Sequence, residues 1–263
     1  MITCYIEAIG SIFTKFIASV GRLFLFFASG VGQVFTLSFQ TNKILDHIWF
    51  IGAKSIFVIL LTGLFTGMVL GLQGYYTLVT FGSEAALGTA VSLTLIRELG
   101  PVLTAIMITA RAGSAMAAEI GVMRMSEQID ALVTMQIDPV RFVFTPRILA
   151  AVLSFPLLTA LFDMVGIFGG YLSGSLLLGI NEAVYMDRVI HSVKMADIWG
   201  GFFKSIVFAF VVTTICCYRG YYSHVNRQGK FGAKGVSLAT TNAVVQSCVI
   251  VLICDYIITS FLV

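Results

Sequence analysis

Long apolar runs dominate the chain and are separated by shorter polar segments. A transmembrane helix needs about 20 consecutive, mainly apolar residues, and five runs are long enough. They cover residues 50–74, 86–110, 148–178, 200–218 and 240–262. This pattern predicts an all-α integral membrane protein with five transmembrane helices.

The composition supports the same fold class. Hydrophobic residues make up 58% of the 263 residues and charged residues only 11%, and the mean hydropathy is +0.97. Soluble domains carry about 25% charged residues. Because no large polar segment is available to fold separately, we expect a single membrane domain over residues 1–263.

Residues 5–27 have a different pattern from the five runs. Lys15 and Arg22 interrupt the segment, while its apolar residues recur at helical spacing and form one face. These apolar residues are Ile9, Ile12, Phe13, Phe16, Ile17 and Val20. The pattern favours an amphipathic helix that lies in the membrane interface. A sixth transmembrane helix is the alternative.

The basic residues are distributed unevenly among the polar segments. If the N-terminus is cytoplasmic, only Arg188 and Lys194 fall in outer loops. Twelve others then lie in or beside cytoplasmic segments: Lys15, Arg22, Lys43, Lys54, Arg111, Arg124, Arg141, Arg147, Arg219, Arg227, Lys230 and Lys234. Cytoplasmic loops of membrane proteins carry an excess of Lys and Arg. The bias therefore predicts a cytoplasmic N-terminus and an outer C-terminus.

Residues 117–137 are too charged to span a bilayer, yet they follow a helical pattern. One apolar stripe recurs at three- and four-residue spacing, and it consists of Val122, Met125, Ile129, Leu132 and Val133. Asp138–Pro139 is expected to stop the helix, because the residue before a proline avoids helical geometry. An amphipathic helix on the cytoplasmic side either rests on the membrane or docks in a groove of a soluble motor subunit.

Arg97 and Glu98 interrupt the apolar run 86–110. In a helix that starts at Ala86, Arg97 lies about 16 Å along the axis, which places the pair near the middle of the bilayer. Ionisable residues at that depth face a protein or water-filled interior and are usually functional. Pro101 predicts a kink beside them. If the pair instead ties helices together, its candidate partners are Lys204, Asp163 and Asp255.

Three glycines recur every four residues in the first apolar run, at Gly63, Gly67 and Gly71. A face of small residues lets two helices approach closely. We favour this packing interpretation over the alternative that the glycines leave room for a lipid tail.

Several long motifs resemble the MlaE (YrbE) family of ABC-transporter permeases. The motifs occur in the family's order and extend through nearly the whole chain. They are GMVLGLQGY (67–75), LIRELGPVLTA (95–105), RAGSAMAAEIGVMRMSEQIDAL (111–132), DPVRF (138–142), PLLTALFDMVGIFGGY (156–171), FFKSIVFAF (202–210), and TTNAVV with DY in the last run.

The resemblance implies a function and a set of partners. Permeases of this family are homodimers in the bacterial inner membrane that assemble with cytoplasmic ABC ATPase subunits and a periplasmic MCE-domain lipid-binding protein. They move phospholipids and maintain the lipid asymmetry of the outer membrane. The segment from Glu119 to Leu132 corresponds to the coupling helix, so the ATPase contacts expected here are Glu119, Arg124, Glu127 and Asp130.

The resemblance also implies that Arg97 and Glu98 line a central lipid pocket. Apolar walls for acyl chains are expected from the first run and the turn after it, from Leu70, Leu72, Tyr75, Leu78 and Phe81. Family members carry Tyr where this chain has Phe81, so a hydroxyl contact to lipid is missing at that position.

Two other functions are compatible with parts of the sequence. Glu98, Asp163 and Asp255 are candidates for the proton relay of an ion-coupled carrier, and Ser114 with His191 or His224 is a remote candidate for an intramembrane hydrolase. The chain has no phosphate-binding loop and no metal-ligand spacing of its cysteines. We therefore expect no metal or cofactor in this chain, ATP bound by a partner subunit, and no nucleic-acid partner.

Overall fold

The computed structural model describes Thr14, residues 17–18 and 21–30, Gly32, residues 41–223 and residues 232–262. Nearly all of this part of the chain is helical, and no strand occurs within it. The predicted all-α class is therefore confirmed. Most of the predicted interfacial segment 5–27 lies outside the described residues, although residues 21–30 are helical.

The described helices have the following bounds: α2 (Thr41–Ile51), α3 (Ile56–Val79), α4 (Leu87–Thr94), α5 (Gly100–Ile108), α6 (Ser114–Met125), α7 (Gln128–Thr134), α8 (Pro139–Tyr171), α9 (Glu182–Ser192), α10 (Met195–Tyr221) and α11 (Ala233–Leu262). Short turns connect some of them: 3-10 turns η1 (Ala53–Ser55) and η2 (Glu84–Ala86), and π-helical turns η3 (Leu95–Leu99), η4 (Thr109–Gly113) and η5 (Leu172–Leu177).

In the described part of the chain, five helical segments are long and apolar enough to span a membrane. We number them spans 1 to 5: Thr41–Val79, Glu84–Met125, Pro139–Leu177, Met195–Tyr221 and Ala233–Phe261. The predicted number is confirmed. Each span extends beyond its apolar run at one or both ends, because the flanking polar residues continue the same backbone hydrogen-bond pattern.

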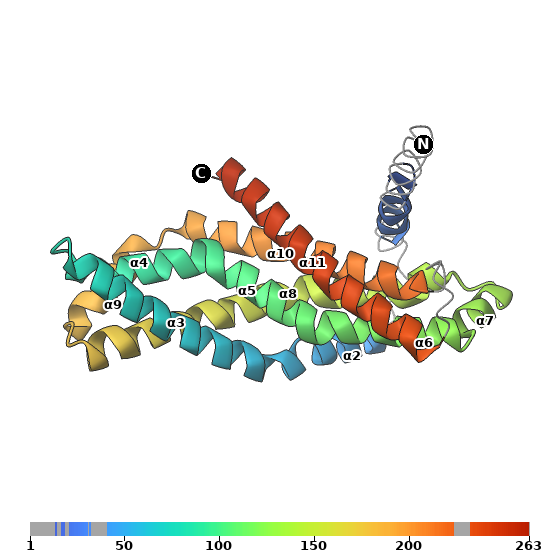
Figure 1. The fold of residues 1–263 in the computed structure, drawn as a ribbon, viewed down its shortest axis with the longest axis horizontal. Helices are drawn as coiled ribbons and strands as arrows, with labels where there is room; N and C mark the ends of the chain where they lie inside the picture. Colours follow the sequence, from blue (N-terminus) through green and yellow to red (C-terminus); the bar gives the residue numbers. More distant parts are fainter. Residues whose placement is uncertain are drawn as a thin grey trace, which may run out of the picture.

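Span 1 and span 3 pack closely through glycines (Figure 1). A Cβ atom added at Gly67 would lie 1.8 Å from the carbonyl oxygen of Gly166, and one added at Gly63 would lie 3.0 Å from that of Phe162. Only a residue without a side chain permits these backbone contacts. The packing interpretation of the glycine face is thus confirmed.

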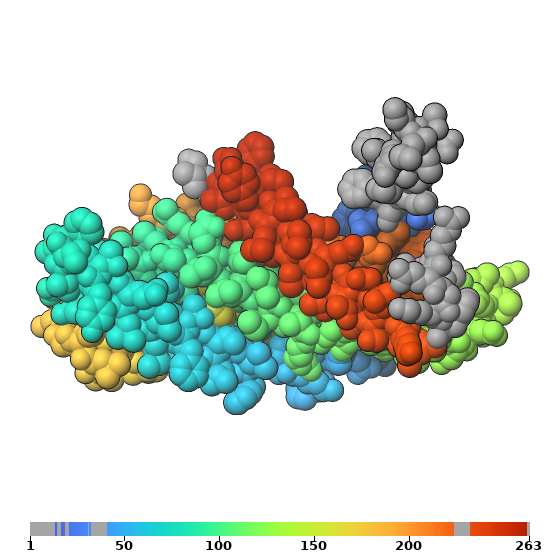
Figure 2. Space-filling view, in the orientation of Figure 1, coloured from blue at the N-terminus to red at the C-terminus, as the bar shows by residue number. Residues whose placement is uncertain are grey.

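The spans differ in how deeply they are buried. The most apolar window of span 4 is 61% buried, whereas that of span 5 is only 11% buried. Figure 1 shows α11 crossing the other helices obliquely, with its C-terminal part extending away from them. Figure 2 shows the same helix lying on the molecular surface. One end of the bundle carries α9 and the opposite end carries α7; we call them the α9 end and the α7 end.

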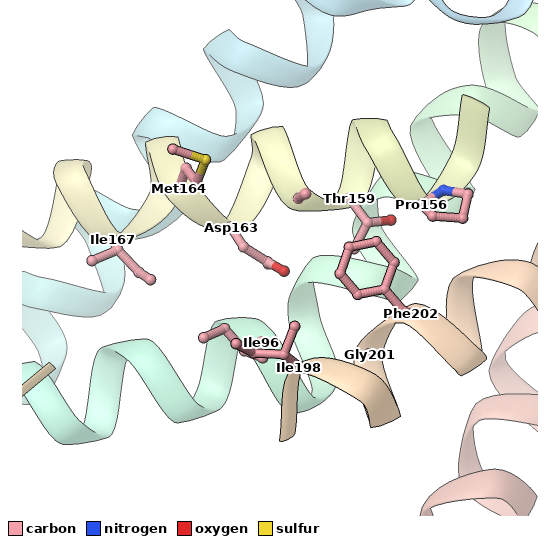
Figure 3. Close-up of a pocket in the computed structure, with 10 residues that line it drawn as sticks. Ile96, Pro156, Thr159, Asp163, Met164, Ile167, Ile198, Gly201 and Phe202 are labelled. Atoms are coloured by element: carbon pink, nitrogen blue, oxygen red, sulfur yellow. The ribbon is translucent and has the colours of Figure 1, made fainter. Parts of the chain in front are cut away.

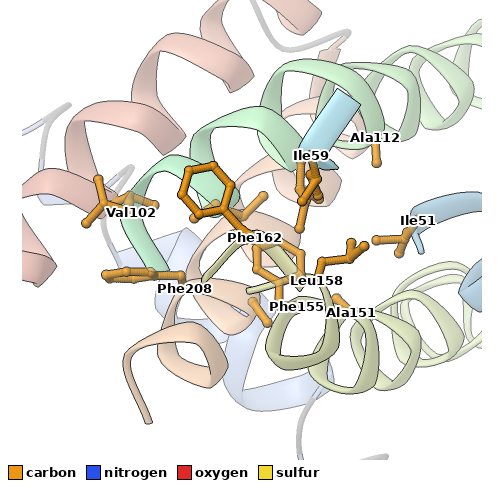
Figure 4. Packing of buried hydrophobic residues seen from close by; sticks show 14 of the residues in the cluster. Ile51, Ile59, Val102, Ala112, Ala151, Phe155, Leu158, Phe162 and Phe208 are labelled. Carbon is orange, nitrogen blue, oxygen red and sulfur yellow. The ribbon is translucent and has the colours of Figure 1, made fainter. Parts of the chain in front are cut away.

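The larger of two hydrophobic clusters in the described part of the chain lies mainly between spans 1 to 4. Figure 4 shows Phe155 and Phe162 from α8 meeting Ile59 from α3 and Phe208 from α10. All four side chains are almost completely buried. Burial of large side chains of this kind stabilises a packed domain by about 1.5–3 kcal/mol each in water; within a membrane, close packing provides the main contribution instead. The core therefore fixes the position of span 2 relative to span 4, and with it the polar residues on these two spans.

The segment predicted as one helix over residues 117–137 is divided in the structure. α6 ends at Met125, Glu127 has a left-handed φ of 57°, and α7 then begins at Gln128. The predicted apolar stripe is split by this break: Ile129 is fully buried, whereas Val122 and Val133 are exposed. The prediction of one continuous amphipathic helix is therefore wrong, because periodicity does not detect a single left-handed residue.

Asp138–Pro139 also has a different role from the predicted one. α7 has already ended at Thr134, and Asp138 is the N-cap of α8. Its Oδ1 accepts a hydrogen bond of 2.9 Å from the backbone N–H of Val140. Proline suits the first position of a helix, since its missing N–H would have no partner there. The dipeptide therefore starts span 3.

Candidate functional site: a buried lysine and its cleft

Lys204 is a charged residue in the interior of the bundle, with only 2% of its side chain exposed. It projects from α10 toward η3 of span 2 and toward α11. Its Nζ donates hydrogen bonds of 2.8 Å to the backbone oxygen of Arg97, to Oε2 of Glu98 and to Oγ1 of Thr259. An ammonium group has three protons, so these three contacts use its full donor capacity.

Asp255 supplies a second negative charge to Lys204. Its Oδ1 lies 3.0 Å from Nζ but makes no hydrogen bond of acceptable geometry. Because the three ammonium protons are already used, the attraction is electrostatic. Thr259 links the two acids, since its hydroxyl lies 3.2 Å from Oε2 of Glu98 and 2.8 Å from the backbone oxygen of Asp255. We call Lys204, Glu98, Asp255 and Thr259 the lysine cluster.

The local structure of span 2 explains the contact with the Arg97 carbonyl. In a regular α-helix this oxygen would accept from the N–H of residue 101, but Pro101 has no N–H. The π-helical turn η3 shifts the backbone bonding here, and the N–H of Gly100 bonds to the oxygen of Leu95. Lys204 supplies the donor that Pro101 lacks. The irregularity predicted at Pro101 is present as a π turn, a feature that often occurs at functional sites.

Arg97 is paired at the mouth of the same site. Its Nε and Nη2 each lie 2.8 Å from Oδ1 of Asp197, and the side chain of Arg97 remains 49% exposed. Oδ2 of Asp197 accepts from the backbone N–H of Lys194 at 3.0 Å, which anchors this carboxylate at the start of α10. Asp197 and Lys204 are seven residues apart, so they lie two turns apart on one face of α10.

These residues border a cleft with about 840 Å³ of open space. The cleft is lined by Arg97, Glu98, Ala196, Asp197, Gly200, Gly201, Lys204 and Thr259. Together with Asp255, the site holds two basic and three acidic side chains at close range. Polar groups of both signs thus face one concave space between membrane-spanning helices.

The sequence predicted part of this arrangement. Lys204 and Asp255 were named as candidate partners of Arg97 and Glu98, and both join the Glu98 side of the site. Asp163 does not, because it lines a separate pocket. Asp197 and Thr259 were not predicted. Thr259 follows Asp255 by four residues, so helical spacing would have placed it on the same face.

Arg97 and Lys204 contact different parts of α10. The partner of Arg97, Asp197, is only two residues into this helix, so the guanidinium lies near the start of α10. Lys204 is nine residues into α10, about 13 Å from its start. The predicted depth of Arg97 near the middle of the bilayer stays a prediction.

The predicted acyl-chain walls lie apart from the cleft. Leu70, Tyr75 and Leu78 on α3 are half-buried against the main core, and Leu72 is also half-buried. Phe81, in the turn after α3, is 76% exposed. None of these residues lines the cleft within one chain. Their assignment to a lipid path stays a prediction.

The predicted coupling residues cluster near the α7 end. Glu119 pairs with the buried Arg147 of α8, with 2.9 Å between Oε2 and Nη2. Arg124 pairs across the break with Asp130 at 2.6 Å. Glu127 is exposed at the left-handed position between α6 and α7. The last three residues thus surround the turn that interrupts the segment.

The candidates for a hydrolase do not meet. Ser114 donates within its own helix to the backbone oxygens of Ala110 and Arg111. His191 lies on α9, close to Asp187 at 3.3 Å, and so belongs to the opposite end of the bundle. His224 lies outside the described residues. Among the described residues, no group of three His, Cys, Asp or Glu could hold a metal ion.

The described part of the chain has five helical segments that are long and apolar enough to span a membrane, and a charged, hydrogen-bonded cleft lies between spans 2, 4 and 5. These features define a multi-pass membrane protein with a polar site among its helices. The chain belongs to the MlaE permease family: the family model described as permease MlaE matches residues 44–261. Relatives named as permeases of ABC transporters cover most of the chain.

Three relatives illustrate the range of the similarity. A probable ABC transporter permease protein of Rickettsia felis is 43% identical over 83% of this chain and 82% of its own length. The intermembrane phospholipid transport system permease protein MlaE of Haemophilus influenzae is 44% identical over 81% of this chain and 79% of its own length. The chloroplastic protein TRIGALACTOSYLDIACYLGLYCEROL 1 of Arabidopsis thaliana is 38% identical over 80% of this chain and 58% of its own length.

Proposed function

We propose that this chain is the permease subunit of an ABC-type phospholipid transporter in a bacterial inner membrane. It acts as a homodimer with cytoplasmic ATPase subunits, which bind the ATP, and with a periplasmic MCE-domain lipid-binding protein. Its N-terminus is cytoplasmic and its C-terminus periplasmic, and its activity maintains the lipid asymmetry of the outer membrane. The name of the Haemophilus influenzae relative, which refers to intermembrane phospholipid transport, supports the substrate class.

The lysine cluster and its cleft carry this proposal. A phospholipid head group combines a phosphate with polar or cationic groups, so its passage between apolar helices requires polar partners of both signs. Arg97 offers a half-exposed guanidinium, the group best suited to phosphate oxygens. Glu98 and Asp255 offer carboxylates nearby. The site therefore has a partner for each end of a zwitterionic head group.

Exposed apolar surfaces support the proposed partners. Large apolar residues along α11 remain exposed in the single chain, among them Val245, Val249, Leu252, Tyr256 and Phe261. A second copy packed on this helix would place two lysine clusters close to one symmetry axis. At the α7 end, Val122, Met125, Val133 and Met135 are exposed beside charged residues, as expected for a surface that docks a soluble ATPase.

The direct test is to purify the complex from its membrane and identify the bound lipid by mass spectrometry. We expect phospholipid with the unaltered chain, and an assembled complex with impaired lipid transport for Arg97→Ala and Glu98→Ala. A photoreactive residue at position 97 should form crosslinks to lipid. Normal transport by both variants, with no lipid crosslink at position 97, would contradict the proposal.

The ATPase-docking surface has its own test. Changing Glu127 and Asp130 to Lys should abolish co-purification of the ATPase, because two charges are reversed and Arg124 then meets a like charge instead of Asp130. The matched control changes Glu182 and Asp187, two exposed acids at the α9 end, to Lys. Equal ATPase recovery with both double variants would place the docking surface elsewhere.

A further inference from the structure

A second pocket lies beside the lysine cluster, on the other side of η3. Its cavity measures about 160 Å³ and lies between α8, α10 and span 2. Figure 3 shows Asp163 and Thr159 of α8 on one wall, with Ile96 of η3 and with Ile198 and Phe202 of α10 opposite. Met164, which is 69% exposed, stands at its mouth.

The polar atoms of this pocket are buried and lack partners. Oδ1 of Asp163 and Oγ1 of Thr159 are both shielded from solvent and accept or donate no hydrogen bond within the described part of the chain. Asp163 and Thr159 are four residues apart on α8, so their side chains lie one turn apart on the same face. Buried polar atoms are nearly always hydrogen-bonded. Both atoms belong to residues that line one pocket, so a ligand with a proton to donate would satisfy the carboxyl oxygen there.

Asp163 is confined to this position by its neighbours. A Cβ atom added at Gly100 would lie 1.8 Å from its Oδ1, so the carboxylate rests directly against the backbone of span 2. The two basic residues of the neighbouring cleft have other partners. Lys204 donates its three protons to other acceptors, and Arg97 pairs with Asp197. Asp163 thus faces the apolar pocket without a cation from the described part of its chain.

The lining of the pocket defines the ligand. Its other side chains are apolar or aromatic, apart from those two polar groups, and its mouth is formed by the exposed apolar Met164 and Ile198. Apolar walls with an exposed apolar rim suit a hydrocarbon chain better than a water-soluble ligand. An acyl chain fits the apolar walls, and only a head group with an N–H or O–H proton can donate to Asp163.

We propose that the Asp163 pocket is a second lipid-binding site, distinct from the cleft, that holds one acyl chain of a lipid with a donor-bearing head group. Ethanolamine and glycerol head groups have the required protons, whereas a choline head group has none. Gly201 lines both the pocket and the cleft, so the two sites are separated only by the backbone of α10 and η3. The proposal rests on the proposed lipid function for its biological meaning, but the binding itself is independent of the partner subunits.

Photolabelling in vesicles tests the proposal. The purified full chain is placed in separate vesicles that contain phosphatidylethanolamine, phosphatidylglycerol or phosphatidylcholine with the same diazirine-bearing acyl chain, and the labelled peptides are mapped. We expect label on residues 156–167 and 198–202 from the first two lipids. The choline lipid should give about tenfold less, the factor that corresponds to losing one hydrogen bond to a charged group.

Variants identify the residues responsible. Asp163→Asn, which keeps the shape of the side chain, should reduce ethanolamine-lipid labelling of these peptides about tenfold. Met164→Trp should block the mouth, whereas Leu157→Trp, at an exposed α8 position outside the lining, should leave the labelling unchanged. Equal labelling by the three lipids, or labelling insensitive to Asp163→Asn, would overturn the proposal.

A variant in the cleft distinguishes the second-site proposal from the proposed function. Arg97→Ala alters the cleft and leaves the Asp163 pocket intact, so pocket labelling should persist in that variant. If Arg97→Ala lost transport while the pocket never labelled, the proposed function would stand and the second site would be wrong. If the pocket labelled selectively while transport were normal in Arg97→Ala and Glu98→Ala, the second site would stand and the proposed function of the cleft would be wrong.

Discussion

The lysine cluster and the Asp163 pocket lie on opposite sides of the same turn of span 2, yet they treat buried charge in opposite ways. In the cluster, the ammonium of Lys204 has every proton bonded and two carboxylates at 2.8 and 3.0 Å. In the pocket, Oδ1 of Asp163 is buried and has no partner among the residues that the structure describes. A buried charge is tolerated when it is paired and costly when it is not. The comparison therefore separates a site held together by its own chain from a site completed by a ligand.

Removal of Lys204 should have the largest effect on stability. Lys204→Met leaves Glu98 and Asp255 close together without their cation, and breaking a buried ion pair in this way costs about 3–5 kcal/mol. Thermal unfolding in detergent micelles should show a strongly lowered midpoint. The triple variant Lys204→Met, Glu98→Gln, Asp255→Asn removes the charges together and should recover most of the loss. A single variant as stable as the unaltered chain would show that the cluster does not hold the helices together.

The two intramembrane aspartates should respond in opposite directions to the same change. Asp255→Asn removes a charge that faces Lys204 and should destabilise the fold by about 1–3 kcal/mol. Asp163→Asn removes a buried carboxyl group whose Oδ1 has no partner among the described residues, and it should leave stability unchanged or raise it by a similar amount in the absence of lipid. Parallel thermal unfolding measures both. Equal destabilisation by the two variants would mean that Asp163 is also paired within the chain.

The same contrast shows which features of the fold and the site could be predicted from the sequence. The five spans follow directly from apolar runs, and the glycine face at Gly67 follows from four-residue spacing, because both features are local. The partners of Glu98 could be named, since few ionisable residues occur in apolar runs. Which acid would join Lys204 and which would stay alone depends on how α8 and α10 face span 2, and this packing is not encoded in any local pattern.

Local backbone irregularities account for the remaining differences. The π turn at Leu95–Leu99 adds one residue to a helical turn, so the side chains here point in other directions than in a regular α-helix. The left-handed Glu127 divides the predicted coupling helix. Glu127 has no unusual sequence signature, as a glycine at this position would have provided. Pro101 indicates an irregularity near the π turn but not its form. Periodicity assumes a uniform helix, so it fails at the positions where this chain departs from one.

Two threonines extend the comparison of the lysine cluster with the Asp163 pocket to single hydroxyl groups. Thr259→Val removes the hydroxyl that accepts from Lys204 at 2.8 Å and should cost about 1 kcal/mol. Thr159→Val removes a hydroxyl with no partner in the described part of the chain, so stability should change by less than about 0.5 kcal/mol. Both variants keep a β-branched side chain of similar size, which isolates the hydroxyl. A larger loss from Thr159→Val would indicate an internal partner for that group.

Arg97 should show a small effect on stability and a large effect on function. Its side chain is half exposed, and exposed ion pairs contribute only up to about 1 kcal/mol. Arg97→Ala should therefore unfold almost as the unaltered chain does, while lipid transport by the assembled complex should fall sharply. Asp197→Ala provides the control: it removes the same ion pair but leaves the guanidinium in the cleft. If Arg97 acts on lipid, only the arginine variant should lose transport. If both variants lost stability and transport together, the pair at the mouth of the cleft would be structural, and the contrast between a self-sufficient cluster and an open cleft beside it would no longer hold.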